Sequence, residues 1–246
     1  VSEAVSLLFF IIYTSMTADK RKYGFRRAFT LRPHLLKGML SISGWTMVQS
    51  FISVSIWFIF FLAIEHLGER PLAVTNIVRN ISALLIMVIS AFATTAGALI
   101  SNQIGAGEQR CLFKTCGMTL KLTYAILIPL LIILCLFPEP VLRAFTDSPS
   151  LIAASVNSVY VMASSTLIMA PSFILFNAVS GTGNTRAGFI MEMISLAVYT
   201  AVIYYGIIRL KPDVALCWFS EHVYGVTLIF LAWWYLKSGK WRGKKV

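Results

Sequence analysis

Long apolar runs alternate with short polar connections along almost the whole chain. Six runs are each long enough to cross a hydrocarbon core, for which about 20 residues are needed; they are 40–64, 72–100, 118–137, 152–177, 188–208 and 214–236. A further apolar stretch, 1–16, opens the chain, and we expect it to be the end of a truncated transmembrane helix. In lipid every backbone polar group must be paired internally, and these runs are too long and too continuous for barrel strands. The pattern therefore predicts an all-α integral membrane protein.

The composition strengthens this prediction. Only 13% of the 246 residues are charged and 58% are hydrophobic, so the polar surface is too small to cover a soluble globule. The opening stretch lacks the basic start and the cleavage site of a signal peptide. We therefore expect a truncated helix at 1–16, a basic cytoplasmic linker at 17–37, a six-helix transmembrane lobe at 38–236 and a basic cytoplasmic tail at 237–246.

Basic residues gather at two places that flank the predicted spans. Twelve of the 21 lie in the linker and the tail: Lys20, Arg21, Lys22, Arg26, Arg27, Arg32, Lys37, Lys237, Lys240, Arg242, Lys244 and Lys245. Positive charge marks the cytoplasmic side of a membrane protein, so both ends of the lobe are expected in the cytoplasm, as an even number of spans requires. This distribution explains the net charge of +11 without a nucleic-acid partner.

The residues that metals and catalysts need are sparse and scattered. The four cysteines, Cys111, Cys116, Cys135 and Cys217, form no C-x-x-C pair, and the three histidines are far apart. We therefore expect free thiols and no metal site. A catalytic cluster at membrane depth is also missing, so the chain is not expected to be an enzyme. A seven-span receptor would place its ends on opposite sides of the membrane, which the distribution of basic residues opposes.

Polar side chains recur at helical spacing inside several spans. In the first span Ser43, Thr46, Gln49, Ser50 and Ser53 share one helix face, where they serve either helix packing or a water-filled cavity. In the second span the corresponding face carries Asn76, Arg79 and Asn80; the arginine either snorkels to the membrane surface or faces the interior of the bundle.

The fourth span combines polar and aromatic residues around a proline. Asn157, Tyr160, Ser164, Phe173 and Asn177 form a face suited to amphipathic organic ligands. Pro171 in this span and Pro129 in the third each remove a helical hydrogen bond, so both helices are expected to bend.

Two short connections contain glycine pairs and follow long spans. The first, S-N-Q-I-G-A-G-E, contains Gly105 and Gly107; the second, S-G-T-G-N-T-R, contains Gly181, Gly183, Asn184 and Arg186. Glycine permits the left-handed backbone that ends helices. Asn184 and Thr185 are expected to cap the next helix, and Arg186 to anchor the turn at the lipid head groups.

These two segments, their spacing and the six spans behind a basic connection resemble the multidrug and toxic compound extrusion (MATE) family. The resemblance implies a twelve-helix transporter of which this chain is the end of helix six, the linker and the C-terminal lobe, working in the bilayer with an N-terminal lobe. It implies a bacterial inner-membrane antiporter that exports organic cations or other amphipathic compounds for protons or sodium ions. The alternative is a lipid-linked sugar flippase of the same superfamily, although Arg79 is the only deep base.

The resemblance also directs attention to the cavity and the coupling ion. Its cavity candidates are Gln49, Ser53, Asn76, Arg79, Asn80, Tyr160, Ser164 and Asn177. Members that bind the cation in this lobe use a glutamate in helix seven and an aspartate in helix ten, where this chain offers Gln49 and no acid. Glu192 and Glu221 lie near span ends, so the coupling carboxylate is expected in the N-terminal lobe. No other cofactor is expected, and replacing Glu192 is expected to leave transport largely intact.

If Gln49 and Asn177 face a shared aqueous cavity, cysteines placed at both positions will react with a water-soluble maleimide. The measurement is labelling of each single-cysteine variant in intact membranes after the native cysteines are replaced. Complete protection of both positions would contradict a shared cavity.

Overall fold

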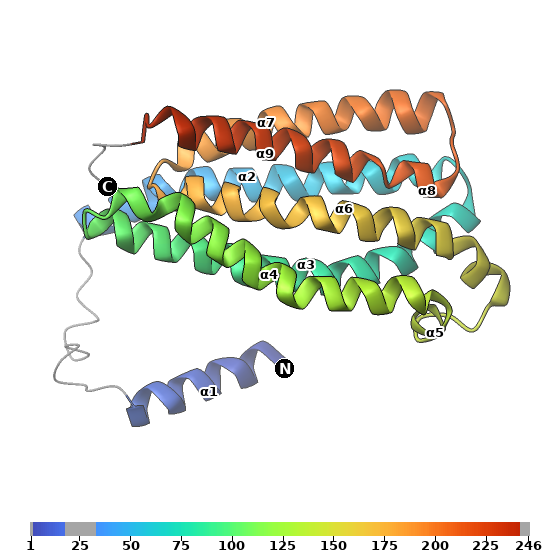
Figure 1. Ribbon diagram of the computed structural model, residues 1–246, viewed down its shortest axis with the longest axis horizontal. Coiled ribbons are helices and arrows are strands. Elements are labelled where there is room, and N and C mark those ends of the chain that lie inside the picture. The colour runs from blue at the N-terminus through green and yellow to red at the C-terminus, as the bar shows by residue number, and fades with distance from the viewer. Residues whose placement is uncertain (1, 18–32, 242–246) are drawn as a thin grey trace. The chain divides into compact units, whose positions relative to one another are not determined.

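The computed structural model describes residues 2–17 and 33–241, and all regular structure in these residues is helical (Figure 1). The predicted all-α class is therefore confirmed. The chain forms two compact units. The first, Val1–Gly44, holds α1 (Ser2–Thr17) and the first part of α2 (Pro33–Glu65); the second, Trp45–Val246, holds the rest. Most of the predicted linker, residues 18–32, lies outside the described residues. Its last five residues were expected to be linker but belong to α2.

Six helical segments of the described chain are long and apolar enough to cross a membrane. After α2 come α3 (Glu69–Gly105), η2 (Gln109–Cys111), α4 (Leu112–Leu136), α5 (Pro138–Arg143), α6 (Pro149–Gly181), α7 (Thr185–Val202), η3 (Ile203–Arg209), α8 (Val214–Cys217) and α9 (Ser220–Ser238). Some helices extend beyond the predicted spans; for example, α3 starts three residues before its predicted span and ends five residues after it. By contrast, α7 and α9 are shorter than their predicted spans because η3 and α8 form parts of those spans.

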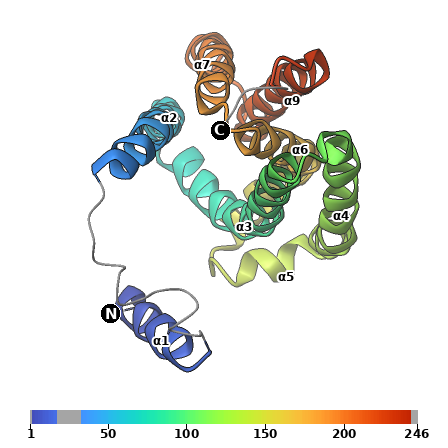
Figure 2. The same cartoon turned by 90° about the vertical axis from the view of Figure 1, so that its left-hand side faces the viewer.

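In the second unit, α6 is the central helix. It packs against α3, α4 and α9, and α7 packs mainly on α9; the end view in Figure 2 shows α3, α4 and α9 around α6. Buried aliphatic and aromatic side chains fill two clusters along this axis, one around Phe60, Met162 and Tyr199 and one around Ile100, Ala178 and Leu236. These helices therefore form one layered bundle with its core along α6.

The backbones of α3 and α6 touch near one end of the bundle. A Cβ atom added to Gly181 would lie 2.5 Å from the carbonyl oxygen of Gly97, and one added to Gly97 would lie 2.9 Å from the carbonyl oxygen of Asn177. Real Cβ contacts are not this short. Only glycine at both positions allows the two helices to approach so closely, as small residues do at many membrane helix interfaces.

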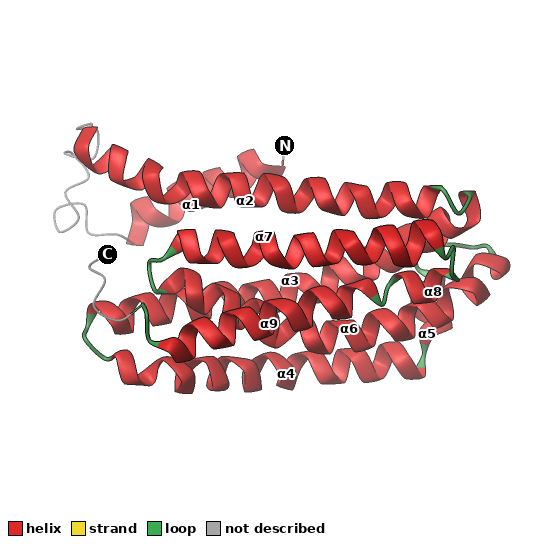
Figure 3. Cartoon of the chain, turned by 90° about the horizontal axis from the view of Figure 1, so that it is seen from above, coloured by secondary structure: helices red, strands yellow, loops and turns green. Residues whose placement is uncertain are grey.

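The connection between α6 and α7 is a tight turn fixed by its polar residues. Gly183 has a φ of 79°, in the left-handed region that favours glycine. The Asn184 side chain accepts a hydrogen bond from the backbone N–H of Ala187 and donates one to the Tyr235 hydroxyl of α9. The cap is thus Asn184, while Thr185 is the first residue of α7. This loop lies at the same end of the bundle as the α3–α4 connection, where Gly107 also has a positive φ (Figure 3).

One irregular helical segment lies away from the two prolines, and the bends expected at the prolines stay a prediction. Both Pro129 and Pro171 lie inside continuous helices, α4 and α6. By contrast, Ile203–Arg209 at the end of α7 is a π-helix, a wider and rarer form. No proline lies in this segment, so its departure from the α-helix was not predicted.

Replacing Gly181 with alanine is expected to destabilise the protein by about 1–3 kcal/mol, because the new methyl group must push α3 and α6 apart. The measurement is thermal unfolding in detergent. Gly117→Ala in α4 is the matched control, since a Cβ there meets no atom within 4 Å, and it should not destabilise. Equal melting temperatures for the wild type and Gly181→Ala would show that the contact is not tight.

Candidate functional site

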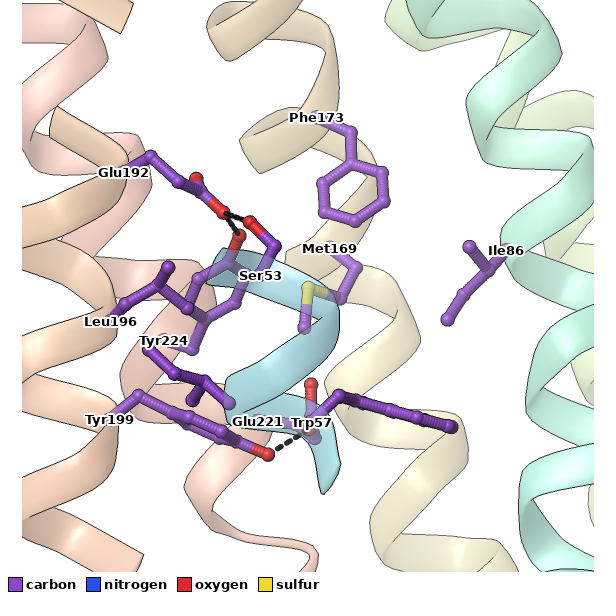
Figure 4. Close-up of a pocket in the computed structure, with 11 residues that line it drawn as sticks. Ser53, Trp57, Ile86, Met169, Phe173, Glu192, Leu196, Tyr199, Glu221 and Tyr224 are labelled. Atoms are coloured by element: carbon purple, nitrogen blue, oxygen red, sulfur yellow. Dashed lines mark hydrogen bonds between the residues drawn. The ribbon is translucent and has the colours of Figure 1, made fainter. Parts of the chain in front are cut away.

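A buried carboxylate joins three helices of the second unit. Glu192 lies on α7, about two turns from the start of that helix, and only 4% of its surface is exposed. Its Oε1 atom accepts a hydrogen bond of 2.9 Å from the Ser53 hydroxyl of α2 and another of 2.9 Å from the Tyr224 hydroxyl of α9. Figure 4 shows both donors converging on this one oxygen. A single carboxylate oxygen therefore ties α2, α7 and α9 together.

A second acid and tyrosine form the matching pair beside it. The Tyr199 hydroxyl of α7 donates a 2.7 Å hydrogen bond to Oε1 of Glu221 on α9. The rings of Tyr199 and Tyr224 pack edge to face, with centroids 5.8 Å apart. Each of the two helices thus supplies one acid and one tyrosine, and each tyrosine donates to the acid of the other helix. This reciprocity is possible because the acid and the tyrosine of each helix lie seven or three residues apart, on one face.

The two acids line a common pocket of about 140 Å³. The lining residues come from α2, α3, α6, α7 and α9: Ser53, Ile56, Trp57, Ile86, Met169, Phe173, Glu192, Leu196, Tyr199, Glu221 and Tyr224. Aromatic and aliphatic groups make up most of the wall, and none of the lining residues in the described part of the chain is basic. The pocket is therefore apolar overall, with two acidic groups and three hydroxyls as its polar features.

Aromatic contacts hold α2 against this site at several levels. Phe60 packs on Tyr199, with ring centroids 6.5 Å apart, and meets Trp218 edge to face at 5.7 Å. Towards the other end of α2, the ring centroids of Trp45 and of Phe189 on α7 lie 5.1 Å apart. The Ser53 hydrogen bond to Glu192 lies between these two contacts in the sequence of α2, so polar and aromatic contacts together define the α2 side of the pocket.

One oxygen of the central carboxylate has no partner within the described part of the chain. Both donors to Glu192 bind Oε1, whereas Oε2 is buried and accepts no hydrogen bond. Ser195, one turn further along α7, likewise has a buried hydroxyl without a partner among the described residues. A buried polar atom without a partner is costly and calls for an explanation. The arrangement can accept a proton or a small cation at Oε2.

Of the residues that the sequence nominated, Ser53 lines this pocket. Gln49 lies one turn earlier in α2, where its backbone carbonyl is 3.0 Å from the Ser53 hydroxyl. Asn177 of α6 donates its side-chain N–H to the carbonyl of Phe173 and lies where α3 approaches α6. Neither Gln49 nor Asn177 is among the lining residues.

The other candidates lie at separate places. On α3, Asn76 donates to the carbonyl of Leu72, Asn80 is exposed and the Arg79 guanidinium lies 5.3 Å from the centre of the Phe61 ring. Tyr160 donates to the carbonyl of Cys135 in α4, and the Ser164 hydroxyl lies 2.9 Å from His222 Nε2 of α9. These five residues do not line the pocket around Glu192, so the candidate set is spread over several surfaces.

Sequence reasoning missed four of the residues that define the site. Tyr199 and Tyr224 were not considered, and Glu192 and Glu221 were set aside because both lie near span ends. The signal was present in their spacing. Glu192 and Tyr199 are seven residues apart, Glu221 and Tyr224 are three apart, and both spacings place an acid and a tyrosine on one helix face.

Ionisable side chains buried inside a membrane-spanning bundle usually mark a functional site. The MatE family model matches residues 46–205, so the chain belongs to the MatE family. Members of this family are transporters, and the chain is accordingly not an enzyme. A comparison with curated protein sequences finds no match.

Several solved structures share this fold. A mutant of the Vibrio cholerae MATE transporter VcmN has a TM-score of 0.76 and 16% identity over 86% of this chain. An outward-facing multidrug resistance MATE family transporter of the MOP superfamily has a TM-score of 0.73 and 14% identity over 83%. A MOP superfamily transporter from Pyrococcus furiosus has a TM-score of 0.71 and 14% identity over 81% of this chain. The matches cover 48%, 46% and 44% of those chains, so this chain spans about half the length of the transporters it resembles.

Replacing Tyr199 with phenylalanine removes the donor to Glu221 and leaves that carboxylate without this partner. We expect a loss of about 1–3 kcal/mol of stability, measured as thermal unfolding in detergent. Tyr205→Phe, in the adjoining segment η3, is the control, because Tyr205 is 67% exposed. A Tyr199→Phe variant as stable as the control would show that the hydrogen bond contributes nothing net.

Proposed function

We propose that this chain forms the C-terminal lobe of a secondary active antiporter that exports organic cations or other amphipathic compounds. The observation that carries the proposal is the pocket of the second unit, which combines four aromatic rings with two acids and has no basic residue among its described lining. An aromatic ring attracts a cation through its face, and a carboxylate attracts it by charge. Both properties of this wall favour a cationic compound over an anionic one.

Exchange for protons or sodium ions is proposed because acids at membrane depth serve ion-coupled transport. The chain spans about half the length of the transporters that it resembles. We therefore propose that an N-terminal lobe completes the pathway and that the two lobes rock about it to give alternating access. That a carboxylate of the N-terminal lobe binds the principal coupling ion remains a prediction.

We further propose a bacterial inner-membrane location, with both ends of the lobe in the cytoplasm. Basic residues gather at the bundle end that holds the α3–α4 and α6–α7 connections and the end of α9: Arg110, Lys114, Arg186, Lys237 and Lys240. The other end carries Glu65, Glu69, Glu139, Asp147 and Asp213, alongside a smaller number of bases. The positive-inside rule then supports the assignment of the first end to the cytoplasm.

A lipid-linked sugar flippase is the second candidate. For the Pyrococcus furiosus transporter, a reversed polarity of the binding pocket is said to suggest a different function, so pocket polarity is a useful criterion. A phosphate-bearing substrate requires basic residues, and Arg79 lies against Phe61 rather than in the pocket. The acidic pocket therefore favours the exporter.

The test is efflux of a fluorescent cationic dye from drug-hypersensitive cells that express this lobe joined to its N-terminal lobe. Efflux should slow when the proton gradient is collapsed or when sodium is withdrawn, and the effective treatment identifies the coupling ion. Cells that carry the empty vector provide the background. A lack of dye efflux from well-expressed protein would contradict the exporter and favour the flippase.

A further inference from the structure

We propose that a groove between α7 and α9 binds an anionic phospholipid, with an acyl chain along its apolar wall and the lipid phosphate beside Lys240. This site is separate from the pocket that contains Glu192. The inference goes beyond the proposed function and does not depend on it, since it concerns the surrounding bilayer and not the transported compound.

The groove lies where α7 and the last two turns of α9 pack on each other (Figure 1). Its volume is about 350 Å³, and its lining residues are Met191, Ile194, Leu231, Trp234, Tyr235, Ser238 and Lys240. The Tyr235 hydroxyl already accepts a 2.6 Å hydrogen bond from the Asn184 side chain. The polar groups that remain are those of Ser238 and Lys240. The wall is therefore apolar along most of its length and cationic at one end, as a phospholipid is apolar along its chains and anionic at its phosphate.

The groove and the acidic pocket lie on different faces of α7. At 3.6 residues per turn, Ile194 points about 160° away from Glu192. The contacts agree with this geometry, because Glu192 is buried and lines the acidic pocket, whereas Ile194 is 44% exposed and lines the groove. Trp234, on the α9 wall of the groove, is 64% exposed. The transport pathway proposed above runs on the pocket side of α7, so the groove faces away from it, towards lipid.

The charge at the mouth of the groove favours an anionic head group. Lys240 lies at the bundle end that also carries Arg186 and Lys237, and the Lys237 ammonium lies 4.6 Å from the centre of the Trp233 ring. None of the described lining residues is acidic. Tryptophan and tyrosine prefer the level of the lipid head groups, and basic pockets between membrane helices bind anionic head groups. A phosphate without a neutralising amine on the same lipid suits this position best.

Local structure fixes the backbone of Lys240 rather than leaving it in a free tail. Gly239 has a φ of 66°, so the chain turns sharply at the end of α9. On the other side of Lys240, Trp241 is buried and its indole N–H donates a 2.9 Å hydrogen bond to the carbonyl of Leu236. The backbone N–H of Lys240 also donates to the Ser238 hydroxyl at 3.4 Å. The lysine is thereby held at the mouth of the groove before any lipid binds.

Lipid binding is measured by native mass spectrometry of the complete, delipidated transporter. The protein is titrated with phosphatidylglycerol or with phosphatidylcholine that carries the same acyl chains. We expect the wild type to bind one phosphatidylglycerol about fivefold more tightly than phosphatidylcholine, the factor that one lysine near a membrane surface contributes. Equal affinities for the two lipids would overturn the proposal.

Lys240→Gln tests the head-group end of the site. This variant should lose the preference for phosphatidylglycerol and bind phosphatidylcholine like the wild type. Lys114→Gln is the matched control, because Lys114 is an exposed lysine of α4 at the same end of the bundle, and it should keep the preference. A Lys240→Gln protein with the wild-type preference would overturn the proposal whatever the other variants show.

Ile194→Trp tests the acyl-chain end, because the larger ring fills the groove and leaves every charge in place. The tightly bound lipid should be lost. Leu122→Trp, at an exposed position of α4, is the control and should retain it. If the N-terminal lobe covers the groove instead, Lys240→Gln and Ile194→Trp will leave lipid binding unchanged and lower the melting temperature, and the lipid site is rejected.

Discussion

A carboxylate removed from water must be compensated by donors or positive charge, and the compensation of Glu192 organises the candidate site. Its two donors come from different helices, Ser53 on α2 and Tyr224 on α9. The carboxyl group therefore keeps both donors only while α2, α7 and α9 hold this mutual position. The rest of the pocket follows from the same arrangement, since Tyr199 and Glu221 are brought together by the packing of α7 on α9.

The two sides of the bundle are packed to different extents. On one side, α3 and α6 are in backbone contact at Gly97 and Gly181, and half of the residues in the apolar central segment of α6 are buried. On the other side, only 17% of the residues in the apolar segment of α2 are buried. The place of α2 in the second unit therefore depends on the contacts of Trp45 and Ser53 and on the buried side chains near its end, Phe60, Ala63 and Ile64. A change at Glu192 acts directly on one of them.

Hydropathy was sufficient to predict the helical class and six spans, because lipid allows a long apolar segment little alternative to a helix. The span predicted at 40–64, for example, corresponds to Ser43–Glu65. The site was not predictable in the same way. Ser53 and Glu192 are 139 residues apart in sequence, and only the packing of their helices brings them together. Helical periodicity placed Ser53 on a polar stripe but carried no information about the partner.

The position of Glu192 along α7 also misled the sequence reasoning, because distance from a helix end is not a measure of burial. Glu192 is about two turns from the start of α7, yet α2 and α9 cover it almost completely. An acid near a span end would face water if its helix stood at the edge of the bundle. Here the covering helices carry a hydroxyl donor each and no base into the pocket. The pocket therefore holds two acids, both of which accept hydrogen bonds from hydroxyl groups.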